Sequence, residues 1–106
     1  MKFTIGDTAS LSRTITDADI RSFADVTGDH NPVHLDDDCA GRSRFGRRIA
    51  HGMLTASLIS SVIANELPGE GSIYLGQTLK FVAPVFPGDT VTAMVTVTDI
   101  RADKQS

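Results

Sequence analysis

The stretch GMLTASLISSVIAN, residues 52–65, decides the fold. Apolar side chains lie on nearly every side of a helix drawn through it, at Met53, Leu54, Ala56, Leu58, Ile59, Val62 and Ile63. A helix that is apolar nearly all round is typical of a buried position rather than a surface one. Pro68 and Gly69 follow and stop it. We therefore predict a buried helix from Gly52 to Asn65 around which the rest of the chain packs.

Two stretches after this helix alternate between apolar and polar residues, as expected of strands with one buried face. They cover residues 73–82 and 90–98, and Pro84 and Pro87 lie between them. The apolar faces are Ile73, Leu75, Leu79 and Phe81 in the first stretch and Val91, Ala93, Val95 and Val97 in the second. The pattern predicts two strands joined by a turn.

The residues at the N-terminus predict a strand followed by a helix. Residues 8–14, TASLSRT, alternate in part and suggest a short strand. Thr16 is a candidate N-cap with Asp19 three residues later, and Ile15 and Ile20 are spaced for a hydrophobic staple. The helix should run to about residue 26, because a glycine at position 28 readily takes the left-handed conformation found after helix ends.

These elements make one small α+β domain over residues 1–106, an antiparallel sheet packed around one buried helix. The chain is 41% hydrophobic and 22% charged, which argues against disorder. A formal net charge of −3 gives no basic field for a nucleic-acid partner.

Cys39 is the only cysteine, so the chain fits a reducing compartment. The start MKFTIGDTAS lacks the pattern of a secretory signal, and the apolar stretch at residues 53–67 is too short and too polar to span a bilayer. We expect a cytoplasmic protein without a membrane partner.

Residues 28–50 are polar and rich in turn formers, and a loop of this length in a compact domain is often functional. Asp29 and His34 lie within it, five residues apart. We expect no helix here, because Asn31 and Pro32 favour a turn that could aim both side chains at one point. A histidine beside a carboxylate is common equipment for moving protons near neutral pH. An Asx-turn aspartate and a packed histidine are the plainer interpretation, and the residues alone leave both open.

The stretch FADVTGDHNPVHLDDDCA, residues 23–40, resembles the hydratase-2 motif of the MaoC-like (R)-specific enoyl-CoA hydratases. The positions of that motif are filled by Phe23, Val26, Thr27, Gly28, Asp29, Asn31, Pro32, Val33, His34 and Ala40. IAHGML at residues 49–54 and GSIYLGQ at residues 71–77 are also similar to the family, and the resemblance extends from about Gly6 to Lys104.

The resemblance implies a hot-dog fold, in which a bent antiparallel sheet wraps round a central helix, here Gly52 to Asn65. It also implies a homodimer and an acyl-CoA thioester substrate, with Asp29 and His34 at the catalytic positions. Water would add reversibly to a trans-2-enoyl-CoA and give the (3R)-3-hydroxyacyl-CoA. We expect Asp29 to be the base and His34 to be the orienting partner and proton donor. Two such groups in contact can titrate as a coupled pair, and the sequence leaves the assignment of base and acid open.

Five further residues are candidates for the site. The backbone N–H of Gly52, at the start of the buried helix, would stabilise the negative charge on the thioester oxygen. Asn31 is a substrate-binding candidate that orients the loop, and Ser57, Ser60 and Ile63 could line an acyl pocket. A sharp turn at Gly52, a simple turn residue at Asn31 and core packing for the other three are the alternatives.

Charged residues flank the motif. The run Asp36-Asp37-Asp38 predicts a solvated face. The basic cluster of Arg42, Arg44, Arg47 and Arg48 could meet CoA phosphates, although ordinary surface charge is the simpler interpretation. We expect no metal and no cofactor, because the chain has neither HExxH nor CxxC and hydration of an enoyl thioester needs no metal.

The chain differs from the family at its C-terminus. Residues 98–106 resemble the turn before two further strands, and we expect these last two strands of the hot-dog domain to be missing. The open sheet edge would then be covered by a longer chain, by a partner, or by assembly of a reduced variant through its edges. The rival interpretations are a dehydratase acting on acyl-carrier-protein thioesters and a non-catalytic thioester-binding or partner subunit. A thioesterase fits the motif less well.

Overall fold

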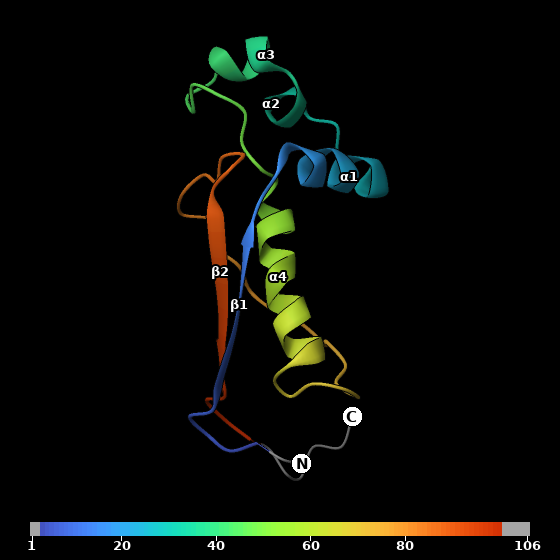
Figure 1. The fold of residues 1–106 in the computed structure, drawn as a ribbon, viewed down its shortest axis with the longest axis vertical. Coiled ribbons are helices and arrows are strands. Elements are labelled where there is room, and N and C mark those ends of the chain that lie inside the picture. The colour runs from blue at the N-terminus through green and yellow to red at the C-terminus, as the bar shows by residue number, and fades with distance from the viewer. Residues whose placement is uncertain (1–2, 101–106) are drawn as a thin grey trace.

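A computed structural model of the protein describes residues 3–100. It consists of one long helix, α4 (Gly52–Asn65), beside a two-stranded antiparallel sheet of β1 (Thr8–Thr14) and β2 (Thr90–Thr96). Three shorter helices lie at one end of α4 (Figure 1). The bounds predicted for the first strand and the long helix are confirmed, and β2 ends two residues before the predicted position. The turn predicted over residues 98–106 falls mostly on residues 101–106, which lie outside the described residues.

The sheet is held by backbone pairing and by hydroxyl pairs on its exposed face. The register runs from Thr8 opposite Thr96 to Thr14 opposite Thr90. The hydroxyls of Ser12 and Thr92 lie 2.7 Å apart, and Thr14 and Thr90 make a similar pair. Such cross-strand pairs stabilise a sheet. The other face packs on α4, where the core is formed by Ile15, Ile20, Ala50, Leu58, Val62 and Ala93.

The helix α1 (Asp17–Thr27) begins and ends as the sequence predicts. The Thr16 hydroxyl accepts from the Asp19 backbone N–H, and the Asp19 carboxylate accepts from the Thr16 N–H, which completes a capping box. Gly28 follows in the left-handed conformation with φ of 79°. Ile15 and Ile20 are both fully buried in the same cluster, as a staple requires.

The prediction of a helix-free loop at Pro32 is wrong. The chain forms α2 (Pro32–Leu35) and α3 (Asp37–Gly41) within this region. Proline lacks an N–H and has a fixed φ, so it suits the first position of a helix, where no N–H bond is needed. The Asn31 side chain supplies the N-cap by accepting from the Val33 N–H at 3.1 Å.

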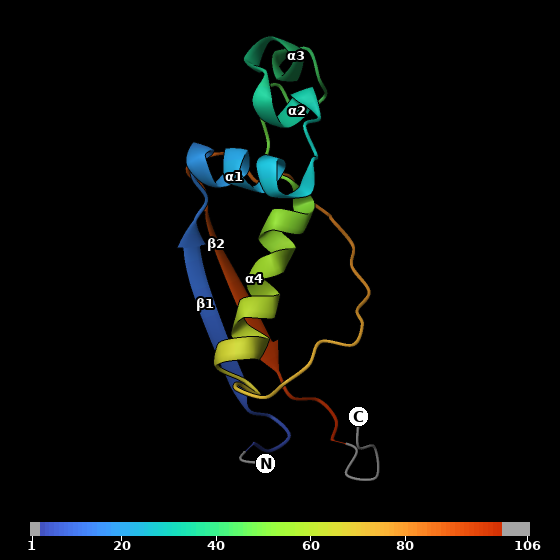
Figure 2. The same cartoon turned by 90° about the vertical axis from the view of Figure 1, so that its right-hand side faces the viewer.

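The predicted strand at residues 73–82 is also absent from the described fold. This segment is irregular and passes α4 on the side away from the sheet (Figure 2). Ile73 and Leu75 are 76% and 77% exposed. A strand needs a neighbour to pair its backbone, and in the described range the sheet contains only β1 and β2. Alternation alone therefore does not produce a strand here.

The helix α4 is less buried than its composition suggests. Within it only Leu58 and Val62 are buried, and Met53 is half exposed. One face of α4 packs on the sheet, and the opposite side contacts only the irregular segment. The apolar side chains all round the helix therefore predict more burial of α4 than residues 3–100 provide. Among these residues no helix is both long and apolar enough to cross a membrane.

Candidate active site

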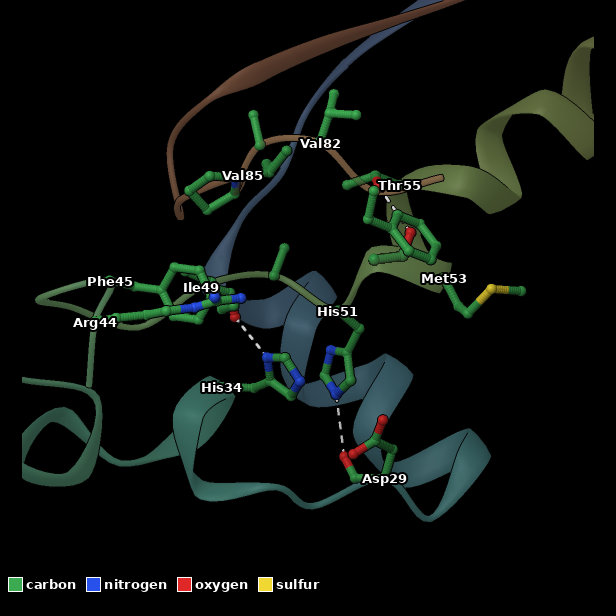
Figure 3. A pocket seen from close by; sticks show the side chains of 15 residues that line it. Asp29, His34, Arg44, Phe45, Ile49, His51, Met53, Thr55, Val82 and Val85 are labelled. Carbon is green, nitrogen blue, oxygen red and sulfur yellow. Dashed lines mark hydrogen bonds between the residues drawn. The ribbon is translucent and has the colours of Figure 1, made fainter. Parts of the chain in front are cut away.

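A pocket of about 510 Å³ opens where the loop after α1, the short helix α2 and the start of α4 meet (Figure 3). Asp29, His34, His51 and Gly52 line it together with apolar side chains such as Val85. Both predicted catalytic side chains, Asp29 and His34, therefore line the same cavity as the predicted oxyanion donor, Gly52. The pocket joins a polar end to an apolar wall, as sites for small molecules commonly do.

Asp29 reaches the pocket because α1 ends abruptly just before it. Gly28 turns the chain in the left-handed conformation, and the Asp29 N–H donates to the Thr27 hydroxyl at 3.2 Å. The Asn31 N–H donates to the Asp29 carboxylate at 3.3 Å, the Asx-turn that was the plainer interpretation. Asp29 is exposed, and among the described residues its carboxylate accepts only this one hydrogen bond. The carboxylate can therefore still accept hydrogen bonds from a ligand.

His34 is buried, and its tautomer follows from its partner. Its Nδ1 lies 2.8 Å from the Ile49 carbonyl oxygen. A carbonyl only accepts, so Nδ1 carries the hydrogen and the Nε2 of the neutral ring has a free lone pair. The Ile49 N–H in turn donates to the Val33 carbonyl at 3.3 Å, which ties α2 to the segment before α4.

His51 is a pocket residue to which sequence reasoning assigned no catalytic role. It is 2% exposed, and its ring stacks on His34 with centroids 3.9 Å apart. Its Nε2 donates to the Asp29 backbone oxygen at 3.0 Å. Figure 3 shows the two imidazoles side by side with Asp29 beneath them. The sequence signal that points to His51 is its position, a polar residue directly before a helix predicted to be buried.

The start of α4 is open toward the pocket. His51 is its N-cap residue but makes no side-chain capping bond. Within residues 3–100 the Gly52 N–H has no hydrogen-bond acceptor in the protein. A Cβ at Gly52 would lie 2.8 Å from the Phe81 ring, so the glycine permits close approach on that side. An unpaired N–H at the positive end of a helix favours negative charge.

Asp29, His34 and His51 place one possible ligand atom each within 4.8 Å of one another, close enough to consider a shared metal ion. The geometry does not favour one. The lone pairs of imidazole lie in the ring plane, and rings stacked at 28° direct them alongside one another instead of to a common point. The arrangement suits proton transfer better.

The predicted substrate-binding residues are dispersed. Asn31 is exposed and caps α2 with its side chain, away from the pocket lining. Ser57 and Ser60 line a second, smaller hollow of about 250 Å³ beside Tyr74, and Met53 is common to both hollows. Ile63 is partly buried and lines neither.

The basic cluster divides into different roles. Arg48 is mostly buried and pairs with Asp17 of α1 and Asp37 of α3, so it fastens the loop instead of facing solvent. Hydrogen bonds from Arg21 and Arg48 lower the pKa of Asp17. Arg44 lines the pocket, whereas Arg47 lies over the Phe86 ring.

Comparison with known proteins places this geometry in context. A family model described as MaoC like domain matches residues 4–106. An (R)-specific enoyl-CoA hydratase from Rhodospirillum rubrum is 52% identical over 100 residues, covering 94% of this chain and 69% of that protein. A protein of the same description from Aeromonas caviae is 51% identical over 94% of this chain and 75% of its own. A solved structure of the (R)-hydratase from A. caviae involved in PHA biosynthesis superimposes with a TM-score of 0.93 at 50% identity, covering 97% of this chain and 78% of that one.

Proposed function

The chain belongs to the MaoC-like domain family, and from that premise we propose how it acts as an (R)-specific enoyl-CoA hydratase. Its activity is that of a hydro-lyase, the reversible addition of water to a trans-2-enoyl-CoA. The observation that carries the proposed mechanism is that one pocket is lined both by an acceptor pair, Asp29 and His34, and by the open helix start at Gly52.

The attacking water would be held between Asp29 and His34. An ionised carboxylate only accepts hydrogen bonds, and the neutral His34 ring has its lone pair on Nε2 because Nδ1–H is bonded to Ile49. Water would donate one hydrogen to each acceptor and keep an oxygen lone pair for the substrate. In this arrangement His34 starts the reaction as a hydrogen-bond acceptor. The sequence predicted it as a proton donor, a role it can take only after it has received a proton.

The β-carbon of the enoyl thioester is electrophilic because the carbonyl withdraws electrons from the double bond. As the water oxygen bonds to this carbon, the π electrons move toward the thioester oxygen, which becomes negative. The unpaired Gly52 N–H would donate to that oxygen. One preorganised donor of this kind contributes about 2.7–4 kcal/mol to stabilising the transition state.

Asp29 and His34 together account for every proton that moves in the reaction. The water proton passes to Asp29 or His34 as the carbon–oxygen bond forms, and the same pair returns one proton to the α-carbon as the carbonyl reforms. Water is consumed, and the enzyme ends in its starting protonation state. Asp29 as the base that removes the water proton is our assignment, and His34 shares the proton with it.

Four finer features belong to this proposal. We place the described helix and strands in a complete hot-dog sheet, which would give the segment at residues 73–82 neighbours to pair with. We also propose a homodimer and a cytoplasmic location. Arg44, at the pocket, is suited to meet a phosphate of CoA.

The test is hydration of crotonyl-CoA, followed as loss of the enoyl-thioester absorbance, with the product configuration determined by chiral chromatography after hydrolysis. The expected product is (3R)-3-hydroxybutyryl-CoA. Substrates of several chain lengths and an acyl-carrier-protein thioester are compared in the same assay. A folded protein that hydrates none of the CoA substrates would contradict the proposal, and activity on the carrier-protein thioester alone would favour the dehydratase alternative.

A further inference from the structure

We propose that His51 is a positioning residue that locks Asp29, His34 and the start of α4 into one geometry. The inference rests on the proposed hydratase function and adds a residue to it. His51 does not take part in the proton transfers described above. It acts through the three groups that do.

The contacts of His51 reach each part of the site. Its Nε2–H donates to the Asp29 carbonyl at 3.0 Å, which holds the backbone that carries the carboxylate. Its ring lies against the His34 ring at 3.9 Å, and Phe23 of α1 lies at 4.8 Å. Its own backbone begins α4, directly before Gly52.

Simple packing does not explain a histidine at this position. The Asp29 oxygen only accepts, so Nε2 carries the hydrogen, and the neutral ring leaves Nδ1 bare. That nitrogen is buried and has no hydrogen-bond partner among the described residues. An unsatisfied buried polar atom costs about 1–3 kcal/mol. Phenylalanine would fill a similar volume without this cost, so the useful part of the side chain is the Nε2–H donor.

The stacked ring also limits the movement of His34. One nitrogen of His34 is bonded to Ile49, so the remaining freedom of the ring is a tilt about that bond. His51 lies against its face and opposes the tilt. Displacement of a reacting group by about 1 Å can lower a rate on the order of 10²-fold. We therefore expect His51 to affect turnover more than substrate affinity.

The test compares His51→Phe with His51→Gln in the full chain. Phenylalanine keeps an aromatic ring but no donor, whereas the glutamine Nε2–H can still donate to the Asp29 carbonyl. His30 provides the matched control, because it is an exposed histidine in the same loop. His30→Phe and His30→Gln are measured alongside, with kcat and KM for crotonyl-CoA and the thermal melting temperature of each protein.

We expect His51→Phe to lower kcat on the order of 10²-fold with little change in KM or melting temperature. His51→Gln keeps the donor but lacks the ring that lies against His34, so it should recover part of this loss, and both His30 variants should match the wild type. An active wild type with an unchanged kcat in folded His51→Phe would overturn the inference and leave the proposed function intact. A larger loss in folded His51→Gln than in folded His51→Phe would also overturn it, since the donor would then matter less than the ring. A folded wild type without activity would overturn the proposed function, and this inference with it.

Discussion

The helices α1 and α4 begin in opposite ways. At α1, Thr16 and Asp19 satisfy each other's backbone N–H groups, and Arg13 adds a bond to the same carboxylate. At α4, the residue before the helix makes no capping bond, and the Gly52 N–H has no acceptor within residues 3–100. The closed start faces solvent, and the open start faces the pocket that contains Asp29 and His34.

The difference implies that the start of α1 contributes to stability and the start of α4 to function. A capped start has used its donors, so it contributes to folding and offers little to a ligand. An uncapped start gives up that stabilisation and keeps its donors and its positive end for an anion. The α1 start should therefore matter for stability alone, whereas the α4 start should matter for catalysis.

The largest effect is expected from the pair beside the open start. Asp29→Asn or His34→Ala should lower kcat for crotonyl-CoA on the order of 10³-fold, because each removes a proton acceptor. Circular dichroism checks that each variant is folded. Asp25→Asn changes an exposed carboxylate of α1 and is the matched control, expected to keep wild-type activity. Folded Asp29→Asn with near-normal kcat would remove this residue from the mechanism.

A smaller loss is expected from closing the open start sterically. Gly52→Ala places a methyl group 2.8 Å from the Phe81 ring, so the ring or the helix start must shift. We expect kcat to fall on the order of 10²-fold, the loss typical of one oxyanion donor. Gly41→Ala is the control, because it lies in α3 with open space around it and no positive φ. Equal activity of Gly52→Ala and Gly41→Ala would contradict the proposed role of Gly52 as the oxyanion donor.

The capped start should respond only in stability. Thr16→Ala removes the hydroxyl that accepts from the Asp19 N–H and should lower the free energy of unfolding by about 1 kcal/mol. Thr16→Ser retains the acceptor and should lose much less. Both are measured by urea denaturation, and both should keep the wild-type kcat per folded molecule. A fall in kcat with Thr16→Ala would break the contrast between the two helix starts.

The smallest effect is a pH dependence at the capped start. Hydrogen bonds from Arg13 and from the Thr16 N–H lower the pKa of Asp19 from 3.8 to about 2. A lowered folded-state pKa stabilises the fold above the unfolded value, and this contribution is lost as pH falls from about 4 toward 2. Urea denaturation across this range should show a smaller fall for Asp19→Asn than for the wild type. Parallel curves would show that Asp19 contributes nothing measurable.

The sequence predicted the parts of the molecule whose signals are local. The capping box at Thr16 and Asp19, the turn at Gly28 and the bounds of α4 all depend on neighbouring residues, and the structure confirms them. Asp29, His34 and Gly52 were also named from the sequence, and the structure brings them to one pocket. Their catalytic roles stay predictions until they are measured.

Features that depend on distant partners were missed. The strand predicted at residues 73–82 has the right alternation, but a strand forms only beside another strand, and this segment lies on the side of α4 away from β1 and β2 (Figure 2). The helix at Pro32 is a local exception, because proline breaks a helix interior but suits a first helical position. The contact between His51 and Asp29 spans 22 residues, so the local signal at His51, a polar residue directly before a helix predicted to be buried, does not identify its partner.

The most direct test of the central claim is the carbonyl stretch of a bound thioester, measured by difference infrared spectroscopy with carbonyl-labelled crotonyl-CoA. Asp29→Asn is used so that the substrate is turned over slowly enough to record the bound state, and Asp29→Asn with Gly52→Ala is the comparison. Donation from the Gly52 N–H polarises the carbonyl, so the account predicts a shift to lower frequency on binding and a smaller shift in the double variant. Binding without any shift, or an equal shift in both proteins, would contradict the claim that the open start of α4 is the oxyanion site.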